Sequence, residues 1–372
     1  MKALVLNAEG RTATVQVVPR PVPEAGEVLV RVEAIALNPV DSLYVFNPLG
    51  DTGRTVGSDF SGIIVESDTS ELPVGQRVAG FLQGACSMNY RPGAFAEFLV
   101  CPSDLLWAVP DGLTAEEAAT VNLCALTAAQ GIYYRLGLKP PFPWDGSGPS
   151  STAEPFTFFI YGASTSVGMY AAQLVRRSAE ASGTTVKLIG AASKGKFAML
   201  RAEPYGFDDL VDYRDSDWPQ QVQASAGVDG VHYAYDCISE GSTVELVSST
   251  LREGGKMAIV RSKEGGAFRS QALTVEPIYG AVWEAFGVEV QYQNLVVSAS
   301  LEARRFAVAF YRWLSGEAAL VANPTRIMPG GLERIVPDGF ALLGSGSMHD
   351  RSQEGDKTWM KPVSAEKLVY RM

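Results

Sequence analysis

The stretch "YGASTSVG", residues 161–168, joins an apolar segment to a segment with helical character. A strand, a glycine-containing turn and a helix in this order are typical of the phosphate loop of a dinucleotide-binding fold. The usual fingerprint is G-x-G-x-x-G/A, but Ala163 and Thr165 stand at its first two glycine positions and only Gly168 is kept. The loop therefore either still binds a nucleotide or is a simple capped turn.

Segments with strand and helix character alternate from this region onward. Strands that alternate with helices at this spacing predict a parallel sheet covered by helices on both faces. About 120 residues of this pattern fit a Rossmann-type, doubly wound domain. The predicted strands are 156–162, 185–193, 209–214, 231–239 and 256–262, and the predicted helices are 166–183, 195–206 and 241–255.

Residues 1–110 have a different pattern, in which short strands are divided by glycine and proline clusters. This pattern predicts a compact, barrel-like domain of antiparallel strands. Residues 113–138 then change to helical character, and Thr114 and Glu117 form a capping-box pattern at their start. The predicted strands of the first domain are 27–38, 62–67, 77–82 and 94–101.

Two segments are predicted to be loops. Residues 139–155 contain five prolines, which neither a helix nor a central strand accommodates, so we expect a surface loop or a domain junction there. Residues 343–360 are polar and rich in glycine and serine, which predicts a second loop. An amphipathic helix is predicted at 301–320 and a final strand at 366–372. The expected domains are 1–138 with a return segment 320–372, the loop 139–155, and the Rossmann domain 156–319.

A dinucleotide loop works by directing backbone N–H groups and a helix N-terminus at the pyrophosphate. The Cβ of Thr165, at the middle glycine position, would push the phosphate outward. In exchange, Ser164, Thr165 and Ser166 place three hydroxyl groups at the helix start, each able to donate to a phosphate oxygen. The alternative interpretation is an ordinary Ser/Thr N-cap. Gly168 is expected to keep the helix close to the strand.

The end of the second predicted strand, "AASKGK" at 191–196, provides a test of nucleotide binding. An NAD enzyme carries Asp or Glu there to accept a hydrogen bond from the ribose hydroxyl. This chain has Lys194 and Lys196 instead, and two ammonium groups attract a 2′-phosphate that a carboxylate would repel. The position favours NADPH, and the alternative is a solvated lysine pair on a surface turn.

Composition argues against several classes of function. The 372 residues carry a net charge of -10, whereas a nucleic-acid partner requires concentrated Lys and Arg. Every apolar run is shorter than the roughly 18 residues of a membrane span, and the opening "MKALVLNAEG" predicts a strand rather than a secretory signal. Four scattered cysteines and two histidines do not supply the converging ligands of a zinc site. We therefore expect a cytoplasmic protein that binds no nucleic acid, membrane or metal.

An ordered set of motifs resembles the medium-chain dehydrogenase/reductase superfamily. The motifs are "ALNPVDSLY" (36–44), "VGSDFSGIIVE" (56–66), "LPVGQRVAGF" (72–81) and "GAFAEFLV" (93–100), followed by the 161–168 loop. The zinc-dependent branch has a His–Glu pair where this chain has "GSDFSG" (57–62), so the chain resembles the zinc-free branch.

A narrower resemblance is to the fungal trans-acting enoyl reductases of highly reducing polyketide synthases, the lovastatin enoyl reductase type. It is carried by "DYR" (212–214), "YAYDCIS" (233–239), the proline-rich insert and "SAEKLVYRM" (364–372). The resemblance implies an α/β fold with a GroES-like, β-rich substrate-binding domain and a Rossmann domain. It also implies that NADPH is the cofactor and that a synthase carries the substrate. We expect the protein to be a monomer.

The resemblance also implies site residues, carried over by position. The implied cofactor contacts are Val40, Asp41, Leu43, Ser164, Thr165, Ser166, Val167, Ser193, Lys194, Lys196, Tyr213, Val260, Arg261, Ser364 and Ala365. The implied substrate contacts are Thr127, Gln130, Tyr134, Tyr279, Gly280 and Trp283.

The catalytic groups depart from the family pattern. The family often has Lys at the position of Leu43, and relatives can carry a hydroxyl at the position of Ala128. We expect Thr127 and Tyr44 to hydrogen-bond near the substrate carbonyl. The alternative for Thr127 is a mid-helix residue that bonds back to its own turn.

Three functions follow from these observations. The first is an NADPH-dependent enoyl reductase that reduces α,β-unsaturated polyketide thioesters on a partner synthase. The second is an NADPH-binding fold that has lost hydride transfer and is an accessory partner or acts on another reaction. The third is a reductase of free enones or quinones.

Overall fold

The computed structural model describes residues 1–144, 146, 154–268, 273–316, 320–352 and 357–372. The chain forms two compact units. Unit 1 comprises Met1–Leu123, Val288–Ala299 and Phe310–Met372, and unit 2 comprises Cys124–Gly287 and Ser300–Ala309. Two helices, α3 (Asn122–Ala129) and α8 (Leu301–Leu314), contribute residues to both units.

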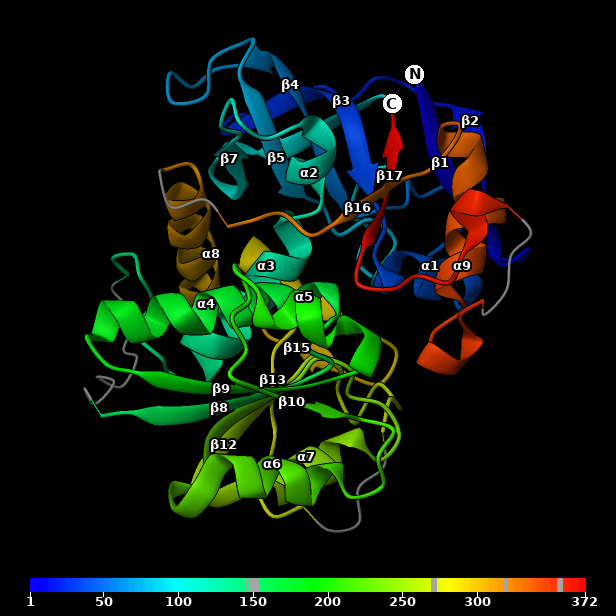
Figure 1. Ribbon diagram of the computed structural model, residues 1–372. Helices are drawn as coiled ribbons and strands as arrows, with labels where there is room; N and C mark the ends of the chain where they lie inside the picture. The colour runs from blue at the N-terminus through cyan, green and yellow to red at the C-terminus, as the bar shows by residue number, and fades with distance from the viewer. Residues whose placement is uncertain (145, 147–153, 269–272, 317–319, 353–356) are drawn as a thin grey trace. The chain divides into compact units, whose positions relative to one another are not determined.

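Unit 2 is built on a six-stranded sheet with the order β10-β9-β8-β11-β12-β13. All neighbouring strands are parallel, and numbered along the chain the order is 3-2-1-4-5-6, that of a Rossmann domain. Helices α4 and α5 cover one face and α6 and α7 the other (Figure 1). The strands are β8 (Phe156–Tyr161), β9 (Val186–Ala192), β10 (Asp209–Asp212), β11 (Val231–Asp236), β12 (Leu251–Ile259) and β13 (Ile278–Tyr279). The helices are α4 (Ser166–Ser182), α5 (Phe197–Arg201), α6 (Trp218–Ala226) and α7 (Thr243–Ser249).

Local sequence signals place the central elements of this sheet. Phe158, Phe159 and Ile160 of β8 are fully buried, because a central parallel strand is covered on both faces. Helix α4 begins after Thr165 and ends at Gly183, whose φ of 65° is the left-handed conformation of a C-cap glycine. The predicted strand and helix around the 161–168 loop are confirmed.

Two predicted helices are wrong in length. The helix predicted over 195–206 contains a short turn and α5, which ends at Arg201, because Pro204 cannot continue a helix. The helix predicted over 241–255 ends at Ser249, and β12 begins at Leu251. Gly254 has a φ of 74° and lies in the segment where the pairing of β11 with β12 shifts register, so the chain is already in the sheet there.

Unit 1 contains a seven-stranded sheet with the order β16-β17-β3-β4-β5-β7, and β6 also pairs with β3. All pairs are antiparallel except β16 with β17, which confirms the predicted antiparallel domain. The C-terminal strand β17 returns to β3, with Val369 opposite Ala36. The strands are β1 (Lys2–Asn7), β2 (Thr12–Val17), β3 (Glu27–Ala36), β4 (Asp59–Ser67), β5 (Arg77–Phe81), β6 (Phe98–Pro102), β7 (Leu106–Ala108), β14 (Val290–Gln291), β15 (Val296–Val297), β16 (Thr325–Ile327) and β17 (Lys367–Arg371). The helices are α1 (Pro39–Phe46), α2 (Ala115–Ala119) and α9 (Ala341–Leu343).

The predicted helical segment 113–138 is divided into α2, α3 and a π-helical turn, Gln130–Arg135. The capping box at its start is present, since Thr114 Oγ1 accepts from Glu117 N at 3.2 Å and Thr114 N donates to the Glu117 carboxylate at 2.9 Å. Residues 124–138 belong to unit 2, although the sequence analysis places them in the first domain. Hydroxyl donation from Tyr133 to Leu174 O (2.7 Å) and from Tyr235 to Thr127 O (2.9 Å) ties them to that unit.

The predicted loops are described in part. Residues 139–144, 146, 154 and 155 contain neither helix nor strand, and the rest of the 139–155 prediction lies outside the described residues. In the 343–360 segment, short 3-10 turns occur at Met348–Asp350 and Thr358–Met360, and 353–356 lie outside the described residues. The helix predicted over 301–320 is α8, and 317–319 are likewise outside the described part of the chain.

A buried carboxylate joins distant segments of unit 1. Asp59 is fully buried and forms an ion pair with Lys367, which is 3% exposed. Its oxygens also accept from Asn38 Nδ2 and from Leu123 N, both at 2.9 Å. The Lys367 ammonium donates further to Thr120 O at 3.3 Å. Beginning, middle and end of the chain therefore meet at one charged group.

We predict that Lys367→Met destabilises the protein by about 3–5 kcal/mol, because it leaves the Asp59 carboxylate buried without its counter-charge. Adding Asp59→Asn to this variant should recover part of the loss. The measurement is urea unfolding followed by circular dichroism. Arg20→Met is the control, because the half-exposed Arg20–Glu66 pair, at 2.7 Å, should contribute less than about 1 kcal/mol. Equal losses for Lys367→Met and Arg20→Met would contradict the prediction.

Candidate dinucleotide-binding site

The loop between β8 and α4 is a tight turn held by backbone hydrogen bonds. Gly162 has a φ of 76°, a backbone conformation that residues other than glycine rarely adopt. Ala163 N donates to Ala191 O of the neighbouring strand at 2.9 Å, and Thr165 N donates to Gly162 O at 2.9 Å. The loop therefore turns sharply from the carboxyl end of β8 into the first turn of α4.

The hydroxyl of Thr165 caps α4. It accepts from Gly168 N at 3.0 Å and donates to Gly162 O at 2.8 Å. In this structure the hydroxyl therefore caps the helix, as the alternative interpretation describes, and contact of Thr165 with a phosphate stays a prediction. Ser164, Ser166 and Val167 lie half-buried beside it, and their contact with a nucleotide stays a prediction.

Gly168, in the first turn of α4, packs tightly against the start of the loop that leaves β8. A Cβ at this residue would lie 2.3 Å from Gly162 O and 3.0 Å from Ala163 Cα. This confirms the expected role of the last fingerprint glycine. The first N–H groups of α4, a helix of 17 residues, are thereby held at the carboxyl edge of the sheet, where a helix N-terminus favours an anion.

Cationic side chains gather at the ends of the neighbouring strands β9 and β10. The side chains of Lys194 and Arg214 are 70% and 59% exposed. Lys194 N and Arg214 N donate to the Asp212 carboxylate at 3.3 and 3.0 Å, so this carboxylate fixes both turns. The Lys194 ammonium lies 3.8 Å from Asp215 Oδ1. Burial acts to raise the pKa of Asp212, but these hydrogen bonds and cations outweigh it and hold its pKa below the ordinary value.

The sequence analysis did not single out Arg214. Its guanidinium carbon lies 4.6 Å from the centre of the Tyr213 ring, a residue implied by the family resemblance. The signal was the "DYR" motif itself, in which a guanidinium follows an aromatic residue at the end of a strand. Tyr213 in turn packs edge-on against Tyr161 of β8, with ring centres 6.5 Å apart. The cationic edge thus consists of Lys194 and Lys196 in the turn after β9 and of Arg214 after β10. Ser193, which begins that turn, and Tyr213 lie next to these cations in the sequence.

The ends of β11 and β12 carry a second set of polar contacts. Asp236, the last residue of β11, is fully buried, and burial raises its pKa to about 6 against hydrogen bonds from the loop that follows. Arg261, after β12, forms an ion pair with Glu240 at 2.5 Å. Val260 N donates to the Ser239 hydroxyl at 3.1 Å. Asp236 and Ser239 were missed by the sequence analysis, although an Asp at a strand end with hydroxyl residues after it is a recognisable turn signal.

The implied substrate residues of unit 2 lie around the π-helical turn. Thr127 lies within α3, and its carbonyl accepts from Tyr235. Gln130 is 2% exposed, and within the described part of the chain its Oε1 and Nε2 have no hydrogen-bond partner. The Tyr134 ring stacks on Phe306 with centres 5.6 Å apart. A buried amide without a partner is costly, and π-helical turns occur often at functional sites, so the region suits a ligand.

The remaining implied residues of this region follow β12 on the chain. Tyr279 ends β13, and Gly280 comes directly after it. A Cβ at Gly280 would lie 2.7 Å from Arg135 Nε. Arg135 also forms an ion pair with Glu284, next to the buried Trp283. The structure thus brings Gly280 beside the π-helical turn, and substrate contact by these residues stays a prediction.

The implied residues of unit 1 lie on α1 and before β17. Asp41 is buried and accepts from Asn38 N at 2.8 Å and from the Ser58 hydroxyl at 2.5 Å. Burial raises the pKa of Asp41 to about 7. Its side chain therefore anchors the start of α1. The neighbouring Val40 is half-buried, and its contact with the cofactor stays a prediction.

Leu43 and Tyr44 are half-buried on the same helix. A Cβ at Gly346 would lie 2.9 Å from Leu43 Cδ1, so the leucine packs against that segment. The rings of Tyr44 and Tyr292 lie 6.4 Å apart. Before β17, Ser364 N donates to Glu366 Oε1 at 3.4 Å, and Ala365 has a φ of 56°. Their roles toward cofactor and substrate stay predictions.

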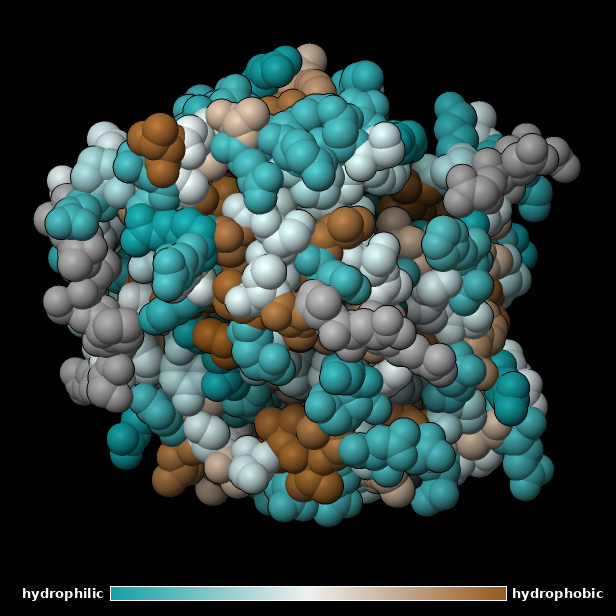
Figure 2. All heavy atoms as spheres, turned by 90° about the horizontal axis from the view of Figure 1, so that it is seen from below, coloured by the Kyte–Doolittle hydropathy of each residue, from teal (hydrophilic) through white to brown (hydrophobic). Residues whose placement is uncertain are grey.

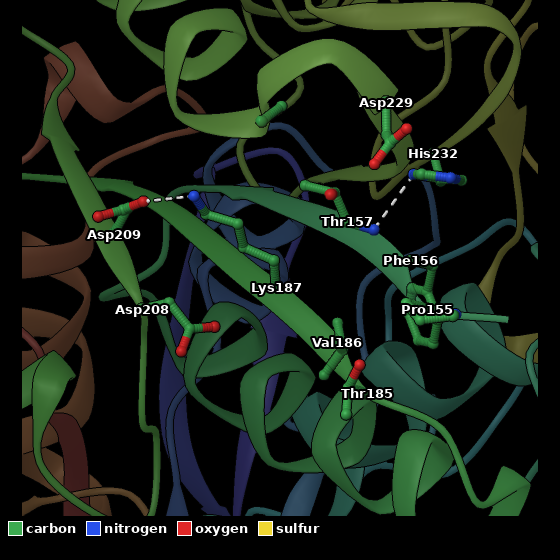
Figure 3. A pocket seen from close by; sticks show the side chains of 11 residues that line it. Pro155, Phe156, Thr157, Thr185, Val186, Lys187, Asp208, Asp209, Asp229 and His232 are labelled. Atoms are coloured by element: carbon green, nitrogen blue, oxygen red, sulfur yellow. Dashed lines mark hydrogen bonds and ion pairs between the residues drawn. The ribbon is translucent and has the colours of Figure 1, made fainter.

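A cavity of about 510 Å³ lies at the opposite edge of the parallel sheet, at the amino ends of β8 to β11 (Figure 3). In it Lys187 pairs with Asp209 at 3.0 Å, and Thr157 N donates to His232 Nδ1 at 3.2 Å. Ligands of open α/β sheets bind at the carboxyl ends of the strands, so this cavity is separate from the candidate site.

Two further properties bear on the class of protein. No group of three or more His, Cys, Asp or Glu side chains that could hold a metal ion occurs among the described residues. Within the same residues, every helix is too short or too polar to cross a membrane. Viewed from below, hydrophilic side chains cover much of the surface, and apolar side chains gather in separate patches (Figure 2).

Comparisons with known proteins agree with this architecture. The family model of the alcohol dehydrogenase GroES-like domain matches residues 24–111, and that of the zinc-binding dehydrogenases matches residues 166–278. The trans-enoyl reductase ACTTS2 of Alternaria alternata is 28% identical over 100% of this chain and 98% of its own length. The trans-enoyl reductase traG of Penicillium crustosum is 27% identical over 99% and 96%.

Solved structures share the fold. The CurK enoyl reductase superposes with a TM-score of 0.70 at 16% identity, and covers 100% of this chain and 99% of its own. Mycobacterial Rv1454c, solved in complex with NADPH, superposes with a TM-score of 0.68 at 20% identity over 100% of both chains.

We predict that Gly168→Ala destabilises the protein by about 2 kcal/mol, because its Cβ would collide with the Gly162 carbonyl and force helix and strand apart. Gly195→Ala is the matched control, since a Cβ there meets nothing within 4 Å. Its effect should stay within about 0.5 kcal/mol. Thermal unfolding of both variants provides the measurement, and indistinguishable melting temperatures would contradict the assigned close approach.

Proposed function

The chain belongs to the medium-chain dehydrogenase/reductase superfamily, and from this premise we propose that it is an NADPH-dependent enoyl reductase. It acts in trans on α,β-unsaturated acyl thioesters carried by a partner polyketide synthase. The observation that supports this most directly is the carboxyl edge of the sheet in unit 2. There a capped helix N-terminus lies at the same edge as two strand ends, that of β9 with two lysines and that of β10 with an arginine. Full-length similarity to proteins named trans-enoyl reductases supports the reaction class.

The residues present fit NADPH. The backbone N–H groups at the start of α4 suit the pyrophosphate, and the hydroxyls of Ser164 and Ser166 flank them. The 2′-phosphate suits the exposed Lys194 and Arg214, because "AASKGK" supplies no carboxylate to accept from a free 2′-hydroxyl. Asp212 and Asp215 neutralise these cations only in part, since Lys196 adds a third positive charge to the same edge.

Reduction of an enoyl thioester by NADPH requires few catalytic side chains from the protein. When bound, NADPH supplies the hydride that reduces the β-carbon of the enoyl thioester. The negative charge that would then gather on the thioester oxygen would be stabilised by a hydroxyl donor aimed at that oxygen, and a proton from solvent added to the α-carbon would complete the reduction. Thr127 and Tyr44 are the proposed donors. The role of the remaining site residues is to orient the acyl chain and exclude water.

One observation favours a second function. Leu43 packs against the Gly346 segment at the position where the resemblance expects a lysine, and Ala128 is fully buried. An enzyme without these two polar groups could bind NADPH and no longer transfer hydride. The alternative is therefore an NADPH-binding accessory protein, or a protein that acts on another reaction.

The experiment that tests the proposal follows NADPH oxidation with a series of pantetheine-linked enoyl thioesters in the presence of a partner synthase. Consumption of NADPH with saturation of the α,β double bond is expected. NADPH quenching of tryptophan fluorescence without consumption would support the accessory role instead. A preference for free enones or quinones over thioesters would support the third alternative.

Size-exclusion chromatography tests the proposed monomer, and fractionation of the native cells tests the proposed cytoplasmic location.

We predict that Lys194→Ala raises KM for NADPH about tenfold and leaves KM for NADH unchanged, because only the phosphorylated ribose meets this ammonium. Lys187→Ala is the control. It removes an ammonium from the other end of the same strand, where Lys187 pairs with Asp209. Steady-state kinetics with both coenzymes provide the measurement. An equal rise for NADH would show that Lys194 acts on the fold rather than on the phosphate.

We predict that Leu43→Lys changes the rate of thioester reduction by less than about threefold, because the proposed site works without this lysine. Leu43→Met controls for the change of shape. Single-turnover kinetics at saturating NADPH provide the measurement. A rise of about a hundredfold or more would mean that the natural protein has lost an essential group, and would favour the accessory role.

A further inference from the structure

The loop that follows β11 is organised by one buried carboxylate. Asp236 Oδ1 accepts from Ile238 N at 2.9 Å and from Ser239 N at 2.8 Å. Its Oδ2 accepts from the hydroxyl of Thr243, at the start of α7, at 2.6 Å. Because three groups of the segment 237–243 donate to one fully buried carboxylate, this carboxylate fixes the course of that segment.

Ser239 connects this loop to the next strand end. It has a φ of 54°, a conformation that residues other than glycine rarely adopt. Its hydroxyl donates to Asp236 O at 2.8 Å and accepts from Val260 N at 3.1 Å, directly after β12. The strain at Ser239 is maintained by the Asp236 carboxylate, and its result is a hydroxyl bridge between the loops after β11 and β12.

These loops lie in the second half of the doubly wound sheet. In the order 3-2-1-4-5-6, the half formed by β8 to β10 carries the capped helix and the lysines, which suit the adenosine end of a dinucleotide. The half formed by β11 to β13 is the second mononucleotide-binding half, so its strand ends receive the nicotinamide end. The Asp236–Ser239 bridge joins the first two strand ends of that half.

We propose that Asp236 is a positioning residue that sets, through Ser239, the two loops that bind the nicotinamide half of the dinucleotide. The inference rests on the proposed NADPH dependence and adds to it the residues that orient the reactive ring. The charged and titratable groups around Asp236 include Glu240, which pairs with Arg261 after β12, and the phenol of Tyr161 on β8. Its chain neighbours, the Tyr235 phenol and the Cys237 thiol, also interact with its charge. Asp236 itself receives hydrogen bonds from the N–H groups of Ile238 and Ser239 and from the Thr243 hydroxyl, all of which are uncharged donors.

The test compares two ligands that share the adenosine end. The dissociation constants of NADP+ and of 2′,5′-ADP, which lacks the nicotinamide half, are measured by tryptophan fluorescence and calorimetry. Ser239→Ala, which removes the bridge, and Asp236→Asn, which disturbs the loop, should weaken NADP+ about tenfold. Both should leave 2′,5′-ADP within about twofold of the natural protein.

Three matched variants separate positioning from loss of structure. Ser249→Ala removes a serine hydroxyl from the end of α7, where it bonds to Leu246 O at 2.7 Å, and should change neither ligand. Thr243→Val removes a donor to Asp236 and should weaken NADP+, whereas Thr243→Ser keeps the hydroxyl and should restore it. Thermal unfolding verifies that each variant is folded.

The outcomes are distinct. Equal weakening of both ligands, or no weakening of NADP+ by Ser239→Ala and Thr243→Val, overturns the positioning role and leaves the proposed function intact. Absence of binding of both ligands to the natural protein overturns the proposed NADPH dependence and the inference with it. Selective loss of NADP+ affinity supports both.

Discussion

The buried carboxylate of Asp59 is the constraint on which unit 1 depends. A carboxylate excluded from water is stable only with a counter-charge and with donors for its lone pairs. Lys367 provides the charge, and Asn38 and Leu123 provide donors from two other segments. Return of the C-terminal strand to β3 therefore also brings the counter-charge to Asp59. The same cluster extends through Ser58 to Asp41, so the start of α1 is fixed by the group that fixes the sheet.

In unit 2 the corresponding constraint is steric. Gly168 lies so close to Gly162 that no Cβ fits, and this approach brings the first turn of α4 to the carboxyl edge of the sheet. The other two glycines of the fingerprint are replaced without loss of the turn. Ala163 donates to the neighbouring strand through its backbone, and Thr165 caps the helix with its hydroxyl. The turn thus needs a glycine at two positions. Gly168 allows the close contact with the Gly162 carbonyl, and Gly162, outside the usual fingerprint positions, provides the positive φ.

Signals that span a few residues were readable from the sequence, and contacts across the fold were not. The period of apolar residues and the Thr114 capping box each act within about one or two helical turns, and each predicted the observed element. Asp59 and Lys367 are separated by 308 residues, and no local pattern announces that they meet. The length of α7 was misjudged because helical propensity before Gly254 yields to pairing with β11, a tertiary effect. Asp236 carries a local turn signal that was overlooked, but that signal does not reveal the Ser239 bridge to β12, which is a contact across the fold.

Fold and chemistry depend on different residues in this chain, and that separation explains how Leu43 can stand where the family often has lysine. Helix α1 is anchored by the buried side chain of Asp41, through Asn38 N and Ser58. The side chain of Leu43 takes no part in these hydrogen bonds and packs against the segment around Gly346. A change between a cationic and an apolar residue there can therefore leave the position of the helix unaltered. The strand ends proposed to bind the dinucleotide belong to unit 2 and share none of these bonds, so the anchoring of α1 and the proposed cofactor contacts of unit 2 depend on separate residues.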